Sequence, residues 1–198
     1  IIVGAGPGGI FSAYELIRLN SSLKLAVFEA GVPLKDRHCP IDGKKVKSCI
    51  KCKTCAIMNG FGGAGAFSDG KYNITNDFGG TLYEYIGKDQ ALELMRYVDD
   101  INTSHGGEKT RMYSTAGTQF KKVCLQNKLK LLDASVRHLG TDINYVVLEQ
   151  LYEELKDKVD FYFNTAVDSL ECTDDGYRVH YKEHTADCRE CIVSVGRS

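Results

Sequence analysis

Residues 1–29 decide the fold of this 198-residue chain, and they read IIVGAGPGGIFSAYELIRLNSSLKLAVFE. A short run of branched apolar residues leads into the glycine turn 4–9, and an amphipathic helix pattern follows. A second apolar strand, 25–28, ends in Glu29. Strand, glycine turn, helix, second strand and terminal acid come in the order of a βαβ unit that binds a dinucleotide.

The glycines and the acid each have a distinct physical role in such a unit. Gly4 permits a tight turn, and Gly6 lets the backbone approach a pyrophosphate because it has no Cβ. Gly9 allows the helix to pack close to the strand, and the free N–H groups of the first helical turn face the phosphates. Glu29 lies twenty residues beyond Gly9. Its carboxylate is expected to accept hydrogen bonds from a ribose and to repel a 2′-phosphate.

The rest of the chain departs from the short alternating units of an NAD dehydrogenase. Segment 1–34 carries the βαβ unit, 35–158 reads as an insertion of loops and helices, and 159–198 returns to strands. We predict an α/β, Rossmann-like three-layer domain with a long insertion. The chain opens inside a strand and ends shortly after another one, so we expect a fragment of a larger protein whose C-terminal remainder is absent.

Apolar spacing and turn residues predict the individual elements. Helices are expected over 83–102, 118–127 and 141–158, the last with an apolar stripe of Val147, Leu148, Leu151 and Leu155. Strands are expected over 128–134, 160–165 and 191–195, and in a hairpin of 166–172 with 177–182.

Composition narrows the class of protein. The net charge of −1 gives no indication of nucleic acid as a partner, and no apolar run reaches membrane-spanning length. Eight cysteines are many, but a chain of this size does not need a disulfide scaffold. We therefore expect a cytoplasmic protein with reduced thiols, without a membrane or nucleic-acid partner.

A basic loop with four cysteines follows the βαβ unit. Residues 35–53 carry seven lysines and arginines against two aspartates, which is typical of a solvated surface loop. Cys49, Cys52 and Cys55 are spaced C-x-x-C-x-x-C, with Cys39 upstream. Four such thiols can bind Zn²⁺ or an iron–sulfur cluster, a C-x-x-C pair can act as a redox dithiol, and unligated reduced thiols are the third alternative.

A second glycine-rich stretch, 60–71, reads GFGGAGAFSDGK. Its side chains are too small to build a core, so a close backbone approach to a cofactor or to another strand explains it. Ser68 and Asp69 add hydrogen-bonding groups and favour the cofactor.

These motifs together resemble a known family. The fingerprint of residues 4–29, with Thr165-Ala166-Val167 and Val195-Gly196 late in the chain, resembles the glutathione-reductase-type FAD domain. More narrowly, the 60–71 stretch, the Arg137-His138-x-Gly140-Thr141-Asp142 segment and the closing Gly196-Arg197-Ser198 look like the poorly characterised FAD-dependent dehydrogenases of bacteria.

The resemblance implies that residues 1–198 form one FAD-binding domain. The residues that it assigns to FAD are Gly4, Gly6, Pro7, Gly8, Gly9, Glu29, Ala30, Gly62, Gly63, Ala64, Phe67, Ser68, Val167 and Gly196. Among these, the five residues of the first turn would contact the pyrophosphate, Glu29 the ribose and the backbone of Val167 the adenine.

The implied activity is that of an FAD-dependent oxidoreductase, a dehydrogenase that moves a hydride between flavin and a small-molecule substrate or electron donor, with NAD(P)H as one candidate donor. His138, Arg137 and Asp69 are the catalytic candidates within the chain. Two alternatives remain, an NAD-linked dehydrogenase and a non-catalytic module that binds a nucleotide or a metal.

Overall fold

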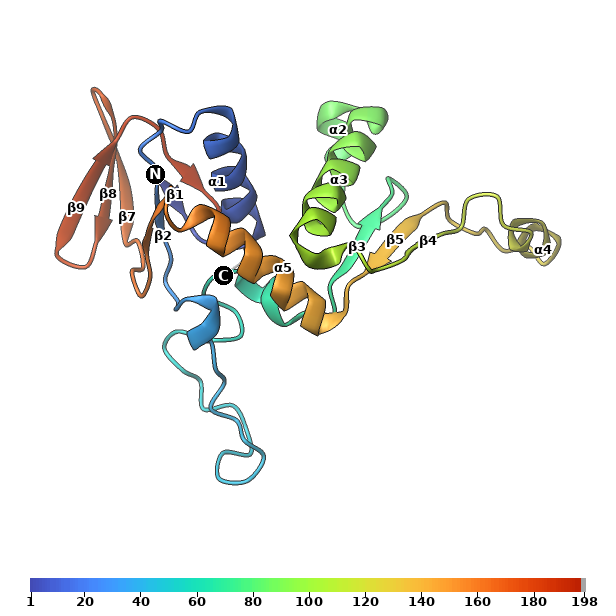
Figure 1. Ribbon diagram of the computed structural model, residues 1–198, viewed down its shortest axis with the longest axis horizontal. Helices are drawn as coiled ribbons and strands as arrows, with labels where there is room; N and C mark the ends of the chain where they lie inside the picture. Colours follow the sequence, from blue (N-terminus) through green and yellow to red (C-terminus); the bar gives the residue numbers. More distant parts are fainter. Residues whose placement is uncertain (197–198) are drawn as a thin grey trace. The chain divides into compact units, whose positions relative to one another are not determined.

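The computed structural model describes residues 1–196, and the chain divides into two compact units. The first unit comprises Ile1–Phe67 and Leu148–Ser198, and the second is the intervening segment Ser68–Val147. The chain passes from the first unit to the second after Phe67 and returns within helix α5 (Gly140–Leu155). Figure 1 labels the elements of both units, which are described separately below.

A four-stranded parallel sheet forms the centre of the first unit. Its strands are β1 (Ile2–Val3), β2 (Ala26–Phe28), β6 (Asp160–Tyr162) and β10 (Ile192–Val193), in the order β10-β1-β2-β6. Ile2 lies opposite Val27 on one side and Ile192 on the other. The predicted α/β architecture with a parallel sheet is therefore confirmed for this unit.

Helix α1 (Pro7–Leu19) joins β1 to β2, as the sequence predicts. Gly6 is its N-cap, and Pro7 occupies the first helical position, where a missing N–H costs nothing. Its buried residues are Gly9, Ile10, Ala13 and Ile17, at the spacing of one helical face. Ile2 of β1 lies beneath Gly9, so this face packs on the sheet.

A second, antiparallel sheet belongs to the same unit. It contains β7 (Ser169–Thr173), β8 (Gly176–Tyr181) and β9 (His184–Cys188). The hairpin of the first two was predicted, but β9 was not, because the turn at Lys182 and Glu183 carries no glycine or asparagine signal. Tyr181 of β8 packs against Phe28 of β2, with ring centroids 4.8 Å apart.

Aromatic side chains from the second glycine stretch, α5 and β6 pack together in the core of this unit. Phe61 is fully buried, and its ring meets Tyr152 of α5 at 5.1 Å and Phe161 of β6 at 5.7 Å. The predicted apolar stripe of α5 is confirmed, since all four of its residues are buried. Phe61 thus anchors the second glycine stretch, whose 3₁₀ helix η2 spans Gly63–Phe67.

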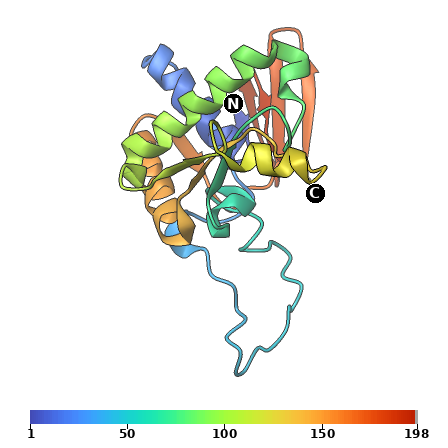
Figure 2. The same ribbon diagram turned by 90° about the vertical axis from the view of Figure 1, so that its right-hand side faces the viewer.

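One long loop leaves this core. The 3₁₀ helix η1 (Leu34–Asp36) follows β2, and the chain then runs without helix or strand to residue 62. Figure 2 shows this segment, which contains the four cysteines, as a long open loop.

The second unit is built around another antiparallel sheet. Strands β3 (Lys71–Ile74), β5 (Ser135–His138) and β4 (Met112–Ser114) lie in that order. The single helix predicted over 83–102 is two helices, α2 (Leu82–Ile86) and α3 (Lys88–Asn102), because Gly87 between them has φ +83°. The turn η3 (Thr103–Gly107) follows α3, and the backbone kinks there at His105 and Gly106. Helix α4 (Phe120–Gln126) corresponds to the predicted helix 118–127.

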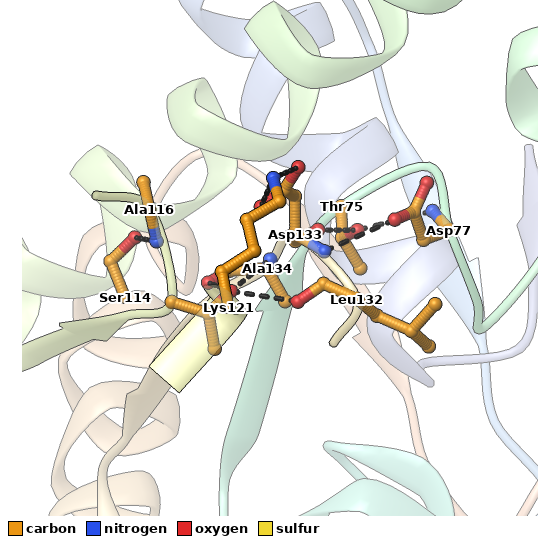
Figure 3. A network of polar contacts seen from close by, with 9 residues as sticks. Thr75, Asp77, Ser114, Ala116, Lys121, Leu132, Asp133 and Ala134 are labelled. Atoms are coloured by element: carbon orange, nitrogen blue, oxygen red, sulfur yellow. Dashed lines mark hydrogen bonds and ion pairs between the residues drawn. The ribbon is translucent and has the colours of Figure 1, made fainter. Parts of the chain in front are cut away.

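The strand predicted over 128–134 is wrong, since the strand β5 begins only at Ser135. Side-chain hydrogen bonds occupy the backbone of this segment instead (Figure 3). Thr75 donates to the carbonyl of Asp133, Asp77 accepts from the N–H of Asp133, and Thr115 donates to the carbonyl of Leu132. These bonds come from residues 17 to 58 positions away, and they satisfy this backbone in place of a strand ladder.

A buried ion pair ties the sheet of this unit to α3. The Arg137 guanidinium on β5 donates to both carboxylate oxygens of Asp99, at 2.6 and 2.8 Å. The two side chains are only 12% and 6% exposed.

Among residues 1–196, no helix is long and apolar enough to cross a membrane.

We predict that Asp99→Ala lowers the free energy of unfolding of the second unit by about 3–5 kcal/mol, because it leaves the Arg137 charge buried without its partner. Asp133→Ala is the matched control: it removes the exposed pair with Lys121 and costs no more than about 1 kcal/mol. Urea unfolding followed by circular dichroism measures both. Equal losses in the two variants would contradict the assignment.

Candidate functional site

A cavity of about 420 Å³ lies in the first unit, where strands β1, β2 and β10 end at their carboxyl sides. In an open parallel sheet, ligands bind outside the carboxyl ends of the strands, at the point where the strand order reverses. The cavity is lined by Val3, Gly4, Gly6, Pro7, Gly8, Phe28, Glu29, Ala30, Met58, Asn59, Gly63, Ala64, Gly65, Thr165, Ala166, Val167, Ser194, Val195 and Gly196.

The first glycine turn has the geometry that its spacing predicts. Gly4 has φ +101°, and a Cβ there would lie 2.5 Å from the carbonyl oxygen of Ser194. A Cβ on Gly9 would lie 1.9 Å from the carbonyl oxygen of Gly4, so this helix start cannot carry a side chain. Gly6 differs, because the nearest atom to its Cβ would be 3.9 Å away. The space over Gly6 is open to a ligand.

The carboxylate of Glu29 is buried and holds three backbone segments together. Its Oε2 accepts the N–H of Ala5 at 2.7 Å, and its Oε1 accepts the N–H groups of Gly31 and Gly60 at 2.8 Å each. The residue is 6% exposed and lines the cavity. A carboxylate offers about four lone-pair positions, so one remains for a ligand hydroxyl.

The second glycine stretch packs directly on the first. The N–H of Gly62 donates to the carbonyl of Ala5 at 2.8 Å, and a Cβ on Gly63 would lie 3.0 Å from Cα of Gly6. Another backbone therefore explains part of this stretch. Gly63, Ala64 and Gly65 also line the cavity, and their approach to a cofactor stays a prediction.

Sequence reasoning identified most of the cavity wall but not all of it. Gly9, Gly62 and Phe67 are not among its lining residues, and Ser68 belongs to the second unit. The lining residues that were not assigned to the cofactor are Val3, Phe28, Met58, Asn59, Gly65, Thr165, Ala166, Ser194 and Val195. Thr165 and Ser194 follow strands of the parallel sheet, a position that could have identified them, whereas nothing local identifies Met58 or Asn59.

One residue of the basic loop is not a solvated side chain. Arg37 is only 6% exposed, and its guanidinium donates to the carbonyl oxygens of Ala56, Ile57, Phe61 and Gly63. The prediction of a wholly solvated basic loop is wrong at this position. The burial of Arg37 depends on contacts up to 26 residues away, which charge composition does not reveal.

The three catalytic candidates lie in the second unit. Arg137 is committed to Asp99 and to the carbonyl of Thr110. Asp69 and His138 are exposed, with 3.8 Å between Oδ2 and Nε2. The hydrogen bond from Lys71 lowers the pKa of the Asp69 carboxyl. Asp69 and His138 are therefore a solvated pair, and Arg137 has a structural partner.

The structure does not support the metal hypothesis for the cysteine loop. Cys49 and Cys52 are exposed, Cys39 and Cys55 are half-buried, and all four are free thiols. Among residues 1–196, no three histidine, cysteine, aspartate or glutamate side chains come together as a metal site would require. The separation of these thiols is a property of the loop fold that the spacing C-x-x-C-x-x-C does not determine.

Known structures share this fold, although no protein-family model and no curated protein sequence matches the chain. Glycine oxidase from Geobacillus kaustophilus aligns with 98% of this chain and 54% of its own, at 14% identity and a TM-score of 0.53. Glycine oxidase from Bacillus cereus aligns over 98% and 53% at 12% identity and a TM-score of 0.49. For L-amino acid deaminase from Proteus vulgaris the values are 98%, 46%, 15% and 0.44.

The chain thus spans about half the length of these solved structures. The first likeness shows that its mixed α/β fold with a parallel sheet is similar to part of the fold of that protein.

Gly9→Ala and Gly6→Ala form a matched pair that separates folding from ligand binding. We predict that Gly9→Ala lowers the free energy of unfolding by about 3 kcal/mol or more, because its Cβ would overlap the Gly4 carbonyl. Gly6→Ala should change it by less than about 1 kcal/mol and fill the ligand space instead. Thermal unfolding and nucleotide titration measure the two effects, and an unstable Gly6→Ala variant would contradict the open geometry.

Proposed function

We propose that this chain is the nucleotide-binding part of an FAD-dependent oxidoreductase and that the cavity holds the ADP moiety of FAD. The observation that carries this proposal is the cavity at the carboxyl edge of the parallel sheet, bounded by both glycine stretches and by Glu29. Its volume of about 420 Å³ is that of a small-molecule site.

The residues of the cavity fit each part of that ligand. The first turn of α1 offers N–H groups without helical partners and the positive end of the helix dipole, which suit a pyrophosphate. The free lone pair of Glu29 suits a ribose hydroxyl, and Val167 lines the cavity where the adenine contact is expected. Ala30 and Gly196 complete the wall. We assign these residues to FAD binding on this basis.

Two observations favour FAD over NAD. The chain between β2 and its neighbour β6 runs to more than a hundred residues, where a dinucleotide domain of a dehydrogenase would continue with short βα units. The fold is also similar to that of an enzyme named as an oxidase. The three-layer arrangement of a glutathione-reductase-type domain belongs to the same proposal.

When bound, FAD would supply the hydride chemistry, and the protein would position it and exclude water. Within this chain the described residues bind and orient the nucleotide. The substrate is proposed to be a small molecule, with NAD(P)H as a candidate donor. We do not assign Arg137 as an acid–base group at the flavin, because its guanidinium is held by Asp99.

Visible absorption tests the cofactor. We predict that the purified chain, after incubation with FAD and gel filtration, keeps a flavin band that dithionite bleaches. Incubation with NAD⁺ under the same conditions should give no retained nucleotide. A colourless chain that releases all FAD while it retains NAD⁺ would overturn the proposal in favour of an NAD-linked enzyme.

The ribose contact gives a second test. A buried carboxylate at Glu29 repels a 2′-phosphate, so we expect ADP-ribose to bind at least about tenfold more tightly than 2′-phospho-ADP-ribose. Isothermal titration calorimetry measures both dissociation constants. Equal affinities would place the adenosine ribose away from Glu29.

A further inference from the structure

Arg37 lies behind the cavity wall with an unusual set of partners. Its Nε donates to Ala56 at 2.9 Å, one terminal nitrogen donates to Phe61 and Gly63 at 2.7 Å each, and the other donates to Ile57 at 2.8 Å. All four acceptors are backbone carbonyl oxygens. The guanidinium also lies 4.8 Å from the centre of the Phe67 ring.

This buried cation has no carboxylate within 4 Å among residues 1–196. Burial lowers the pKa of the Arg37 guanidinium, while the nearby Glu29 carboxylate and the Cys55 thiol oppose that shift. The group stays charged, because the guanidinium of arginine is not deprotonated in proteins. Four carbonyl dipoles, rather than an ion pair, therefore stabilise a positive charge beside the cavity.

The contact with Gly63 fixes the direction of a backbone donor. In a trans peptide the C=O of one residue and the N–H of the next point in opposite directions. The carbonyl of Gly63 faces Arg37, so the N–H of Ala64 points away from the guanidinium. Gly63 and Ala64 both line the cavity. Ala64 is also near the start of η2, where N–H groups have no partner inside the turn.

We propose that Arg37 is a positioning residue for the nucleotide site: it holds the wall 56–63 so that the N–H of Ala64 donates to a phosphate of the ligand. This inference rests on the proposed function and deepens it, because it adds the N–H of Ala64 as a phosphate donor besides those of the first turn of α1. A charged partner on the carbonyl side polarises the peptide and strengthens its N–H as a donor. The same clamp joins both ends of the cysteine loop, since Arg37 precedes the loop and Ala56 follows it.

The first test compares ligands with and without phosphates on variants of the full chain. Arg37→Lys keeps the charge but loses the planar fork that reaches four carbonyls. ADP should bind roughly ten- to hundredfold more weakly to this variant, whereas adenosine should change by no more than about twofold. Lys35→Gln, which removes an exposed neighbouring cation on η1, is the control and should change neither affinity.

Two further measurements protect the test against a variant that unfolds. For Arg37→Ala, millimolar guanidinium ion should restore part of the ADP affinity. In the unmodified chain, binding of ADP but not of adenosine should shift the amide proton of Ala64 in the NMR spectrum and slow its exchange.

Three outcomes would overturn the proposal: ADP affinity unchanged in Arg37→Lys, a parallel loss of ADP and adenosine in a folded variant, or an Ala64 amide that does not respond to ADP. If the unmodified chain binds neither ADP nor FAD, the proposed function itself fails. That result is distinct, because it appears before any variant is compared.

Discussion

The buried carboxylate of Glu29 is the contact on which the candidate site depends. It joins the turn after β1, the segment after β2 and the second glycine stretch through the N–H groups of Ala5, Gly31 and Gly60. Hydrogen bonds to a charged group contribute about 1.5–3 kcal/mol each. Among residues 1–196, none of these three N–H groups donates to a neighbouring strand instead. Without this acceptor, three loops would bury unpaired N–H groups.

Arg37 is the counterpart of Glu29 on the same backbone. Glu29 accepts an N–H at Gly60, and Arg37 donates to carbonyl groups on both sides of it, so one short segment is held by charges of opposite sign. A loop whose buried N–H and C=O groups are both hydrogen-bonded can line a cavity as rigidly as a strand does. Two glycines make this approach possible: a Cβ on Gly31 would lie 2.3 Å from the nitrogen of Gly60, and a Cβ on Gly60 would lie 2.7 Å from Arg37.

In the second unit, polar side chains that look functional in the sequence stabilise the fold. Arg137 is paired with Asp99, and the network around Asp133 replaces the ladder of a predicted strand. His138 lies on β5 opposite Lys71 of β3, Asp69 precedes β3, and both Asp69 and His138 are exposed. A reactive residue type next to a glycine motif is therefore weak grounds for a catalytic role.

Local pattern alone determined the βαβ unit, the glycine turn, Glu29 and the stripe of α5, because each depends on residues within a few turns of one another. The break at Gly87, the third strand β9 and the start of β5 escaped it, since turn geometry and side-chain bonds there override propensity. Only the tertiary structure decided that Arg37 is buried, that Met58 and Asn59 line the cavity, and that no three of the loop cysteines gather as a metal site within residues 1–196. The physical reason is that burial and hydrogen-bond partners in loops are set by segments distant in sequence, which no local period encodes.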